Sequence, residues 1–248
     1  MTSSYALEVV NLQKAFGGLS VTQNVSLAIR PGERRLIIGP NGAGKTTLFN
    51  QISGDMRPNS GQIKLFGADV TQMAPYKRAH LGLSRTYQII TLVADDTLEH
   101  NVSLGLLGLR PSRWQMWRPL SFYGDFAIEA RRILDAVGLL HLAQHSASDI
   151  AYGEKRRVEL AMALAQKPRV LLLDEPLAGL SNAERSTVKS LIASIPRQTT
   201  VIMIEHDMDT ALDLAETVTL LNYGRVIVDG DRDAVIADQR TREVYLGV

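Results

Sequence analysis

Short apolar runs bounded by glycine and proline dominate the two ends of the chain. Three of them lie within the first forty residues, at Leu7–Val10, Val25–Ile29 and Arg34–Ile38, and predict strands because they are rich in Val, Ile and Leu and are flanked by turn signals such as Pro31-Gly32. Further strands are predicted at Gln62–Phe66, Val170–Leu173, Thr200–Ile204, Val218–Leu221 and Val226–Val228, the last two joined at Tyr223-Gly224. After Pro168 these runs have little polar interruption, which is typical of parallel strands buried on both faces.

Helical patterns separate the strands. Helices are predicted over Lys45–Ser53, which Gly54 ends, over Ala183–Ile195 and over Met208–Ala215. Between Thr91 and Lys167 the strand pattern fades and helical spacing takes over. Strands alternating with helices predict an α/β fold with a parallel sheet covered on both faces. We therefore expect residues 1–90 and 168–248 to form one lobe, with residues 91–167 inserted into it as a helical lobe.

Composition narrows the class of protein. The 248 residues are 45% hydrophobic and 21% charged, with 27 basic and 26 acidic side chains, as in globular proteins rather than disordered ones. The net charge of +1 gives no basic surplus, so we expect no nucleic-acid partner. The absence of cysteine excludes disulfides, thiolate metal sites and a cysteine nucleophile. Neither a secretory signal nor a long apolar span is evident, so we expect any membrane association to come through a partner.

A glycine-rich loop lies between the strand ending at Ile38 and the following helix. It reads Gly39-Pro40-Asn41-Gly42-Ala43-Gly44-Lys45-Thr46-Thr47 and matches G-x-x-x-x-G-K-[ST], the phosphate-binding loop. Glycines let backbone N–H groups turn toward phosphate oxygens, and the helix N-terminus adds the positive end of its dipole. We expect the Lys45 ammonium to reach the β- and γ-phosphates and the Thr46 hydroxyl to bind Mg²⁺. A turn that merely links strand and helix would rarely match both the pattern and its context, so the loop predicts a nucleoside triphosphate site.

Two adjacent carboxylates end the most apolar strand, in Leu171-Leu172-Leu173-Asp174-Glu175-Pro176. Acids next to a buried sheet are costly unless a cation or a chemical role offsets their desolvation. Asp174 suits Mg²⁺, directly or through water, and Glu175 suits orienting or deprotonating the attacking water in phosphoryl transfer. A solvated strand end is the alternative, and the phosphate loop upstream makes it less favoured.

The order of these motifs resembles the ATP-binding cassette of ABC transporters over nearly the whole chain. The resemblance implies a P-loop NTPase fold with a mostly parallel sheet, an N-terminal antiparallel β subdomain and the inserted helical lobe, binding ATP and Mg²⁺. It also implies that Phe16 stacks on adenine, that Gln88 senses the metal and the lobe interface, and that His206 contacts the γ-phosphate in catalysis. The simple alternatives are Phe16 as a core residue and Gln88 and His206 as loop polar residues.

Two segments depart from the family pattern. Where the family has L-S-G-G-Q at a helix start, this chain has Ile150-Ala151-Tyr152-Gly153-Glu154, so alanine replaces the serine that donates to the γ-phosphate. By the resemblance, Tyr152, Gly153 and Glu154 would complete the ATP site of a second cassette. The departure bears on how much this chain contributes to that partner's site, and not on its own Lys45 and Glu175. The second departure is Ser181, where the family often has aspartate. Ser181 and Glu184 form an S-x-x-E capping box, which is sufficient to explain the serine.

Three motif variants are the segment from Ala151 to Leu160, the segment from Glu175 to Ser181, and Glu205-His206-Asp207-Met208. They resemble most closely those of the cassettes that import branched-chain and related hydrophobic amino acids. That resemblance implies an identical or different second cassette, transmembrane permease subunits, an indirect periplasmic solute-binding protein and a place on the cytoplasmic face of the membrane. Cassettes for lipid or lipopolysaccharide export and for urea import share much of it. A soluble ABC ATPase would carry two cassettes or a long coiled coil, and Glu175 and His206 argue against a regulator that does not hydrolyse ATP.

The segment Arg110–Pro119 holds both tryptophans among three arginines. Such a segment suits a surface near lipid headgroups or a groove for a partner helix. It also suits a loop that caps the helical lobe with its tryptophans turned inward, which we favour.

Overall fold

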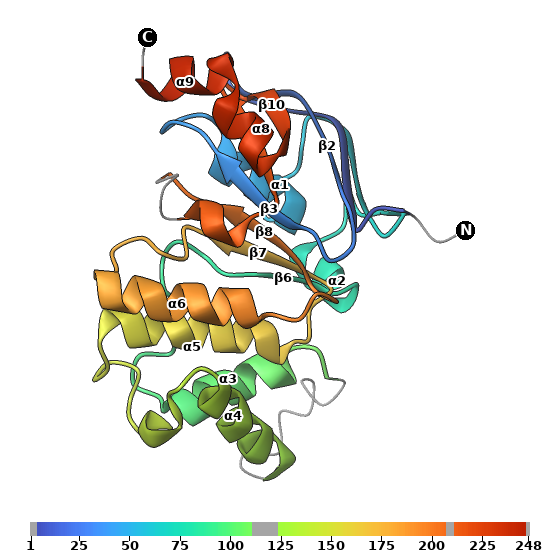
Figure 1. Ribbon diagram of the computed structural model, residues 1–248. Coiled ribbons are helices and arrows are strands. Elements are labelled where there is room, and N and C mark those ends of the chain that lie inside the picture. Colours follow the sequence, from blue (N-terminus) through green and yellow to red (C-terminus); the bar gives the residue numbers. More distant parts are fainter. Residues whose placement is uncertain (1–3, 111–123, 207–210, 247–248) are drawn as a thin grey trace.

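Two sheets organise the chain in a computed structural model that describes residues 4–110, 124–206 and 211–246 (Figure 1). The smaller sheet is antiparallel, in the order β2-β1-β4-β5, and the larger has the order β10-β9-β3-β8-β7-β6, parallel except for the β9–β10 pair. The smaller sheet contains β1 (Leu7–Phe16), β2 (Leu19–Ile29), β4 (Ser60–Leu65) and β5 (Ala68–Asp69). The larger contains β3 (Arg34–Ile38), β6 (Leu83–Arg85), β7 (Val170–Asp174), β8 (Thr200–Ile204), β9 (Thr217–Asn222) and β10 (Arg225–Asp231). The expected fold class is confirmed.

The helices of the described residues pack on both faces of the larger sheet or form a separate group away from it. They are α1 (Lys45–Ser53), α2 (Pro75–His80), α3 (Leu98–Leu107), α4 (Gly124–Ala136), α5 (Tyr152–Ala165), α6 (Asn182–Ser194), α8 (Arg232–Ala237) and α9 (Gln239–Leu246), with short 3-10 turns η3 (Leu140–Leu142) and η4 (Leu212–Leu214). Figure 1 shows α5 and α6 side by side beneath the sheet, with α3 and α4 farther from it. Of the predicted helix Met208–Ala215, residues 208–210 lie outside the described residues, and the described part contains the 3-10 turn η4.

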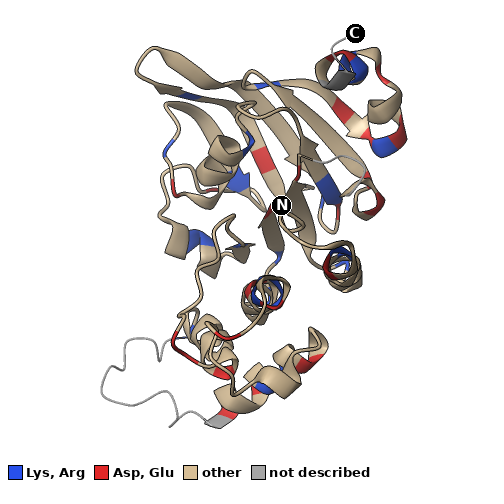
Figure 2. Cartoon of the chain, turned by 90° about the vertical axis from the view of Figure 1, so that its left-hand side faces the viewer, with Lys and Arg blue, Asp and Glu red and all other residues tan. Residues whose placement is uncertain are grey.

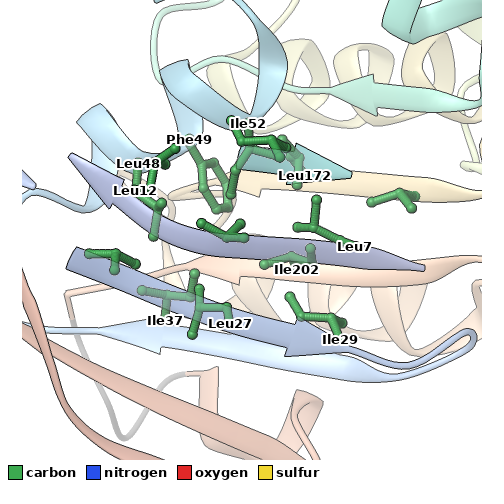
Figure 3. Packing of buried hydrophobic residues seen from close by; sticks show 14 of the residues in the cluster. Leu7, Leu12, Leu27, Ile29, Ile37, Leu48, Phe49, Ile52, Leu172 and Ile202 are labelled. Atoms are coloured by element: carbon green, nitrogen blue, oxygen red, sulfur yellow. The ribbon is translucent and has the colours of Figure 1, made fainter. Parts of the chain in front are cut away.

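Alternate residues of the central strands point to opposite faces of the sheet. Ile37, Leu172 and Ile202 pack with α1 and the inner face of the antiparallel sheet (Figure 3). Their strand neighbours Leu36 and Leu173, among others, pack on the other face against residues of α5 and α6. Helix α1 therefore lies between the two sheets, which fixes the phosphate loop at its N-terminus.

A third hydrophobic cluster consists of residues between Leu98 and Ala165. Helix α5 contributes to both sides: Val158 and Ala161 belong to this cluster, whereas Leu160 and Ala163 belong to the cluster beneath the sheet. This arrangement agrees with an inserted helical lobe, and the boundaries at residues 90/91 and 167/168 stay a prediction.

Two strands run farther than the pattern predicts. Asn11 and Asn24 have positive φ angles of 48° and 53° and lie beside register shifts of the β1–β2 pair. These irregularities break the apolar alternation while the pairing continues, so the prediction stopped too early. Strand β6 and helix α2 were not predicted, because three and six residues are too short for a periodic signal.

Charges of both signs are interspersed over the ribbon (Figure 2). None of the described helices combines the length and the apolarity that crossing a bilayer requires.

Candidate functional site

The glycine-rich loop is held by close backbone contacts. A Cβ atom at Gly39 would lie 2.1 Å from the carbonyl oxygen of Leu221, and one at Gly44 would lie 2.5 Å from that of Val21. Both glycines also have positive φ, 155° and 99°. Only glycine satisfies both conditions, so the loop is packed into a fixed shape by β2 and β9.

Lys45 is the first residue of α1 and is buried. Its ammonium donates to the carbonyl oxygens of Gly39, at 2.6 Å, and Pro40, at 3.1 Å, within the loop itself. Burial lowers the pKa of Lys45 from its ordinary value, while the Glu175 and Asp174 carboxylates oppose that change. A buried ammonium whose partners are neutral carbonyls is well placed to donate hydrogen bonds to a phosphate anion.

Asp174 ends β7 and is buried, at 1% exposure. Its Oδ2 accepts a hydrogen bond from Arg85 Nη2 at 2.7 Å, whereas its Oδ1 is buried and has no hydrogen-bond partner among the described residues. A buried, unpartnered carboxylate oxygen is uncommon, and hard oxygen ligands are what Mg²⁺ prefers. Asp174 thus fits a Mg²⁺ site in which the Thr46 hydroxyl is a second candidate ligand.

Glu175 lies in the turn directly after β7 with a positive φ of 47°. Its Oε2 accepts from Gln88 Nε2 at 3.0 Å and lies 4.0 Å from His206 Nδ1. The structure thereby brings together three residues that are 31 to 118 positions apart in the chain. A glutamate held beside a phosphate loop by an amide, with an imidazole 4.0 Å away, has the geometry expected of a group that orients water.

A cavity of ≈ 280 Å³ joins these parts. Its lining comprises Val21, the loop residues Asn41, Gly42, Ala43, Gly44, Lys45, Thr46 and Thr47, and both Gln88 and Glu175. Phe16 ends β1 and is 47% exposed, so it is no core residue, and its role as an adenine platform stays a prediction. The cavity is thus lined both by phosphate-loop residues and by the Glu175–Gln88 pair.

The departing segment lies at the N-terminus of α5. Ala151 is the N-cap residue and makes no side-chain cap, while its N–H donates to Glu154 Oε2 at 2.8 Å. The Glu184 carboxylate accepts from the hydroxyl and the N–H of Ser181, and these bonds lower its pKa. Its Oε1 also lies against Gly153, where an added Cβ would be 2.3 Å from it. The capping box predicted for Ser181 is confirmed. A carboxylate of this chain therefore already occupies part of the helix end that the family offers to the partner's γ-phosphate.

Sequence reasoning missed two arginines and one apolar residue of the site. Val21 follows the Gly17-Gly18 turn, which returns the chain beside the loop. Arg85 bonds Asp174, as described above. Arg156 of α5 donates to the carbonyl oxygens of Tyr87 (2.8 Å), Gln88 (3.3 Å) and Glu175 (3.4 Å), and pairs with Glu159. The repeated basic residues at the start of α5 were the available signal for Arg156.

Known proteins match this chain along most of its length. A family model described as ABC transporter matches residues 22–178. The high-affinity branched-chain amino acid transport ATP-binding protein BraF of Pseudomonas aeruginosa is 34% identical, with 97% of each chain covered. LivG of Escherichia coli, a protein of the same description, is 32% identical, again with 97% of each covered. A crystal structure of a nucleotide-free ATP-binding cassette from an ABC transporter has a TM-score of 0.87 at 27% identity, covering 98% of this chain and 100% of that one.

Proposed function

Because this chain belongs to the ABC transporter family, we propose that it is the ATP-hydrolysing cassette of an importer for branched-chain or related hydrophobic amino acids. The observation that carries the proposal is the cavity in which the phosphate loop faces Glu175, held by Gln88. The described functions of BraF and LivG support the choice of solute.

The residues around the cavity have separate roles in binding and hydrolysing ATP. Lys45 and the loop N–H groups bind the phosphates, Thr46, Asp174 and Gln88 are the candidate ligands of Mg²⁺, and Phe16 is the candidate adenine platform. Bound Mg²⁺ would neutralise charge on the β- and γ-phosphates. Glu175 orients the attacking water and accepts its proton, and His206, 4.0 Å from Glu175, is placed to contact the γ-phosphate.

The partners follow from the same proposal. A second cassette, identical or different, closes over the ATP, and transmembrane permease subunits hold both at the cytoplasmic face of the membrane. A periplasmic solute-binding protein acts on the permease and not on this chain. ATP drives the cycle by binding the closed pair of cassettes more tightly than the open one.

Glu175→Gln tests the hydrolytic role. The amide keeps the shape of the side chain but cannot accept the proton, so we expect turnover in the assembled complex to fall about 10²- to 10⁴-fold while ATP still binds. Glu243→Gln, at an exposed glutamate of α9, is the matched control and should leave turnover unchanged. Undiminished hydrolysis by Glu175→Gln would overturn the assignment.

Uptake measurements test the solute. The chain is co-expressed with the proposed second cassette and permease subunits, and the solute-binding protein is added to membrane vesicles made from these cells. The vesicles should then show ATP-dependent accumulation of radiolabelled leucine, isoleucine or valine. Hydrolysis without accumulation of any of the three would assign the cassette to another ABC system.

A further inference from the structure

Arg85 is the last residue of β6, and its side chain is 5% exposed. Strand β6 pairs in parallel with β7, so Arg85 and Asp174 both lie at the carboxyl ends of neighbouring strands. The guanidinium also lies over the ring of Tyr87, the residue before Gln88, at 4.8 Å from the ring centroid. One buried cation is therefore placed between the carboxylate of β7 and the segment that carries Gln88.

The guanidinium divides its hydrogen bonds between two elements. Nη2 binds Asp174 Oδ2 at 2.7 Å, and Nη1 binds Asn50 Oδ1 at 2.7 Å, Ser53 Oγ at 3.0 Å and Asp55 Oδ2 at 3.1 Å. Asn50, Ser53 and Asp55 lie at the C-terminal end of the helix whose first residue is Lys45. Arg85 thus ties the phosphate-loop helix to the candidate metal carboxylate.

The two oxygens of Asp174 have different surroundings. Arg85 occupies Oδ2, while Oδ1 has no hydrogen-bond partner among the described residues. A carboxylate fixed through one oxygen cannot rotate freely, so the other oxygen is presented in a constant direction. Outer partners of this kind orient metal-binding carboxylates and make the ligand available without contacting the metal themselves.

We propose that Arg85 is a positioning residue for Mg²⁺: it fixes Asp174 through Oδ2 so that Oδ1 faces the metal of the bound nucleotide. This inference rests on the proposed ATPase site. It is distinct from a purely structural role, in which Arg85 only neutralises a buried carboxylate. The structural role requires charge compensation alone, whereas the positioning role requires that metal affinity depend on Arg85.

The test compares nucleotide binding with and without metal. A fluorescent ATP analogue is titrated into the full-length chain in EDTA and then at increasing Mg²⁺. For Arg85→Lys and Arg85→Met we expect affinity in EDTA to match the unsubstituted chain, while the Mg²⁺ concentration for half-maximal enhancement rises roughly 10- to 100-fold, the usual cost of losing an outer partner. Arg85→Lys keeps the charge, so it provides a variant to measure if Arg85→Met fails to fold.

Asp55→Asn is the matched control, because it alters the other acidic partner of the same guanidinium and leaves Asp174 unchanged. It should leave the Mg²⁺ dependence unchanged even if the melting temperature falls. An unaltered Mg²⁺ dependence in folded Arg85→Lys, or an equal shift in Asp55→Asn, would overturn the positioning role. Failure of the unsubstituted chain to bind the analogue at any Mg²⁺ concentration would instead overturn the proposed function.

Discussion

Lys45 has only neutral hydrogen-bond partners in the structure, and the proposed ATP site would give it a charged one. In the structure its ammonium is buried and bonded to the carbonyls of Gly39 and Pro40. Burial lowers its pKa in this state. A bound polyphosphate would add negative charge next to the ammonium and raise the pKa again, so nucleotide binding and protonation of Lys45 are linked.

The linkage has a definite sign. At alkaline pH a fraction of the free protein has neutral Lys45, and binding restores the proton, so we expect proton uptake on binding and an affinity that falls as pH rises. Calorimetric titrations in two buffers of different ionisation enthalpy measure the protons exchanged. Lys45→Arg should bind without uptake, since guanidinium stays charged. Proton release by the unsubstituted chain would contradict the prediction.

Residues within one local motif could be predicted, and residues brought together by packing could not. The phosphate loop and the Asp174-Glu175 pair depend on neighbours a few positions away. By contrast, Arg85 reaches Asp174 only because β6 pairs with β7, which no pattern within three residues can indicate. Phe16, Gln88 and His206 lie between these cases, because the order of motifs pointed to them and their roles stay predictions.

At the scale of elements, buried arginines satisfy the C-terminal carbonyls of two helices. Arg78 of α2 donates to the carbonyl oxygens of Gln51, Ile52, Thr71 and Met73, around the end of α1. Arg34 does the same at the end of α6, through the carbonyls of Ile192, Ala193 and Ile195. Helix ends leave several carbonyls without intrahelical partners, and burying them unpaired is costly.

Removing the first of these arginines should destabilise the fold. Arg78→Met keeps much of the volume but leaves the carbonyls at the end of α1 unpaired, so we expect the free energy of unfolding to fall by about 3 kcal/mol or more. Urea denaturation followed by circular dichroism measures it. Lys77→Met, at an exposed position of the same helix, should change stability by less than about 0.5 kcal/mol. Equal effects of the two substitutions would contradict the capping role.

Elements were predictable where their apolar pattern was long and regular. The central strands β3, β7 and β8 and the helix α1 lie within a residue of their predicted bounds. Strands β1 and β2 of the antiparallel sheet extend beyond their predicted bounds because two asparagines interrupt their alternation.

At the scale of the whole molecule, the N-terminus of α5 is the part of this chain that would meet the ATP of a second cassette. Here the Ala151 side chain has no donor, and the Glu184 carboxylate lies against Gly153. Both features weaken the attraction for a phosphate. We therefore expect this chain to complete its own site through the partner and to contribute less to the partner's.

Restoring the serine should strengthen the closed pair. In the Glu175→Gln background, which preserves ATP, Ala151→Ser should lower the ATP concentration for half-maximal association of the cassettes about tenfold, since a hydrogen bond to a charged group contributes about 1.5–3 kcal/mol. Size-exclusion chromatography over an ATP series measures the association. Ala136→Ser, at an exposed position of α4, should have no effect. An unchanged midpoint for Ala151→Ser would show that the missing hydroxyl does not limit closure.

The three carbonyl contacts of Arg156 have a mechanical consequence. A single side chain of α5 is fastened to the backbone of Tyr87, Gln88 and Glu175 at once. A rotation of the helical segment would therefore displace the backbone of Glu175 and of Gln88 together. If a membrane subunit moved the helical segment, Arg156 would transmit that movement to the backbone of Gln88 and Glu175. This one side chain would then couple transport to ATP hydrolysis.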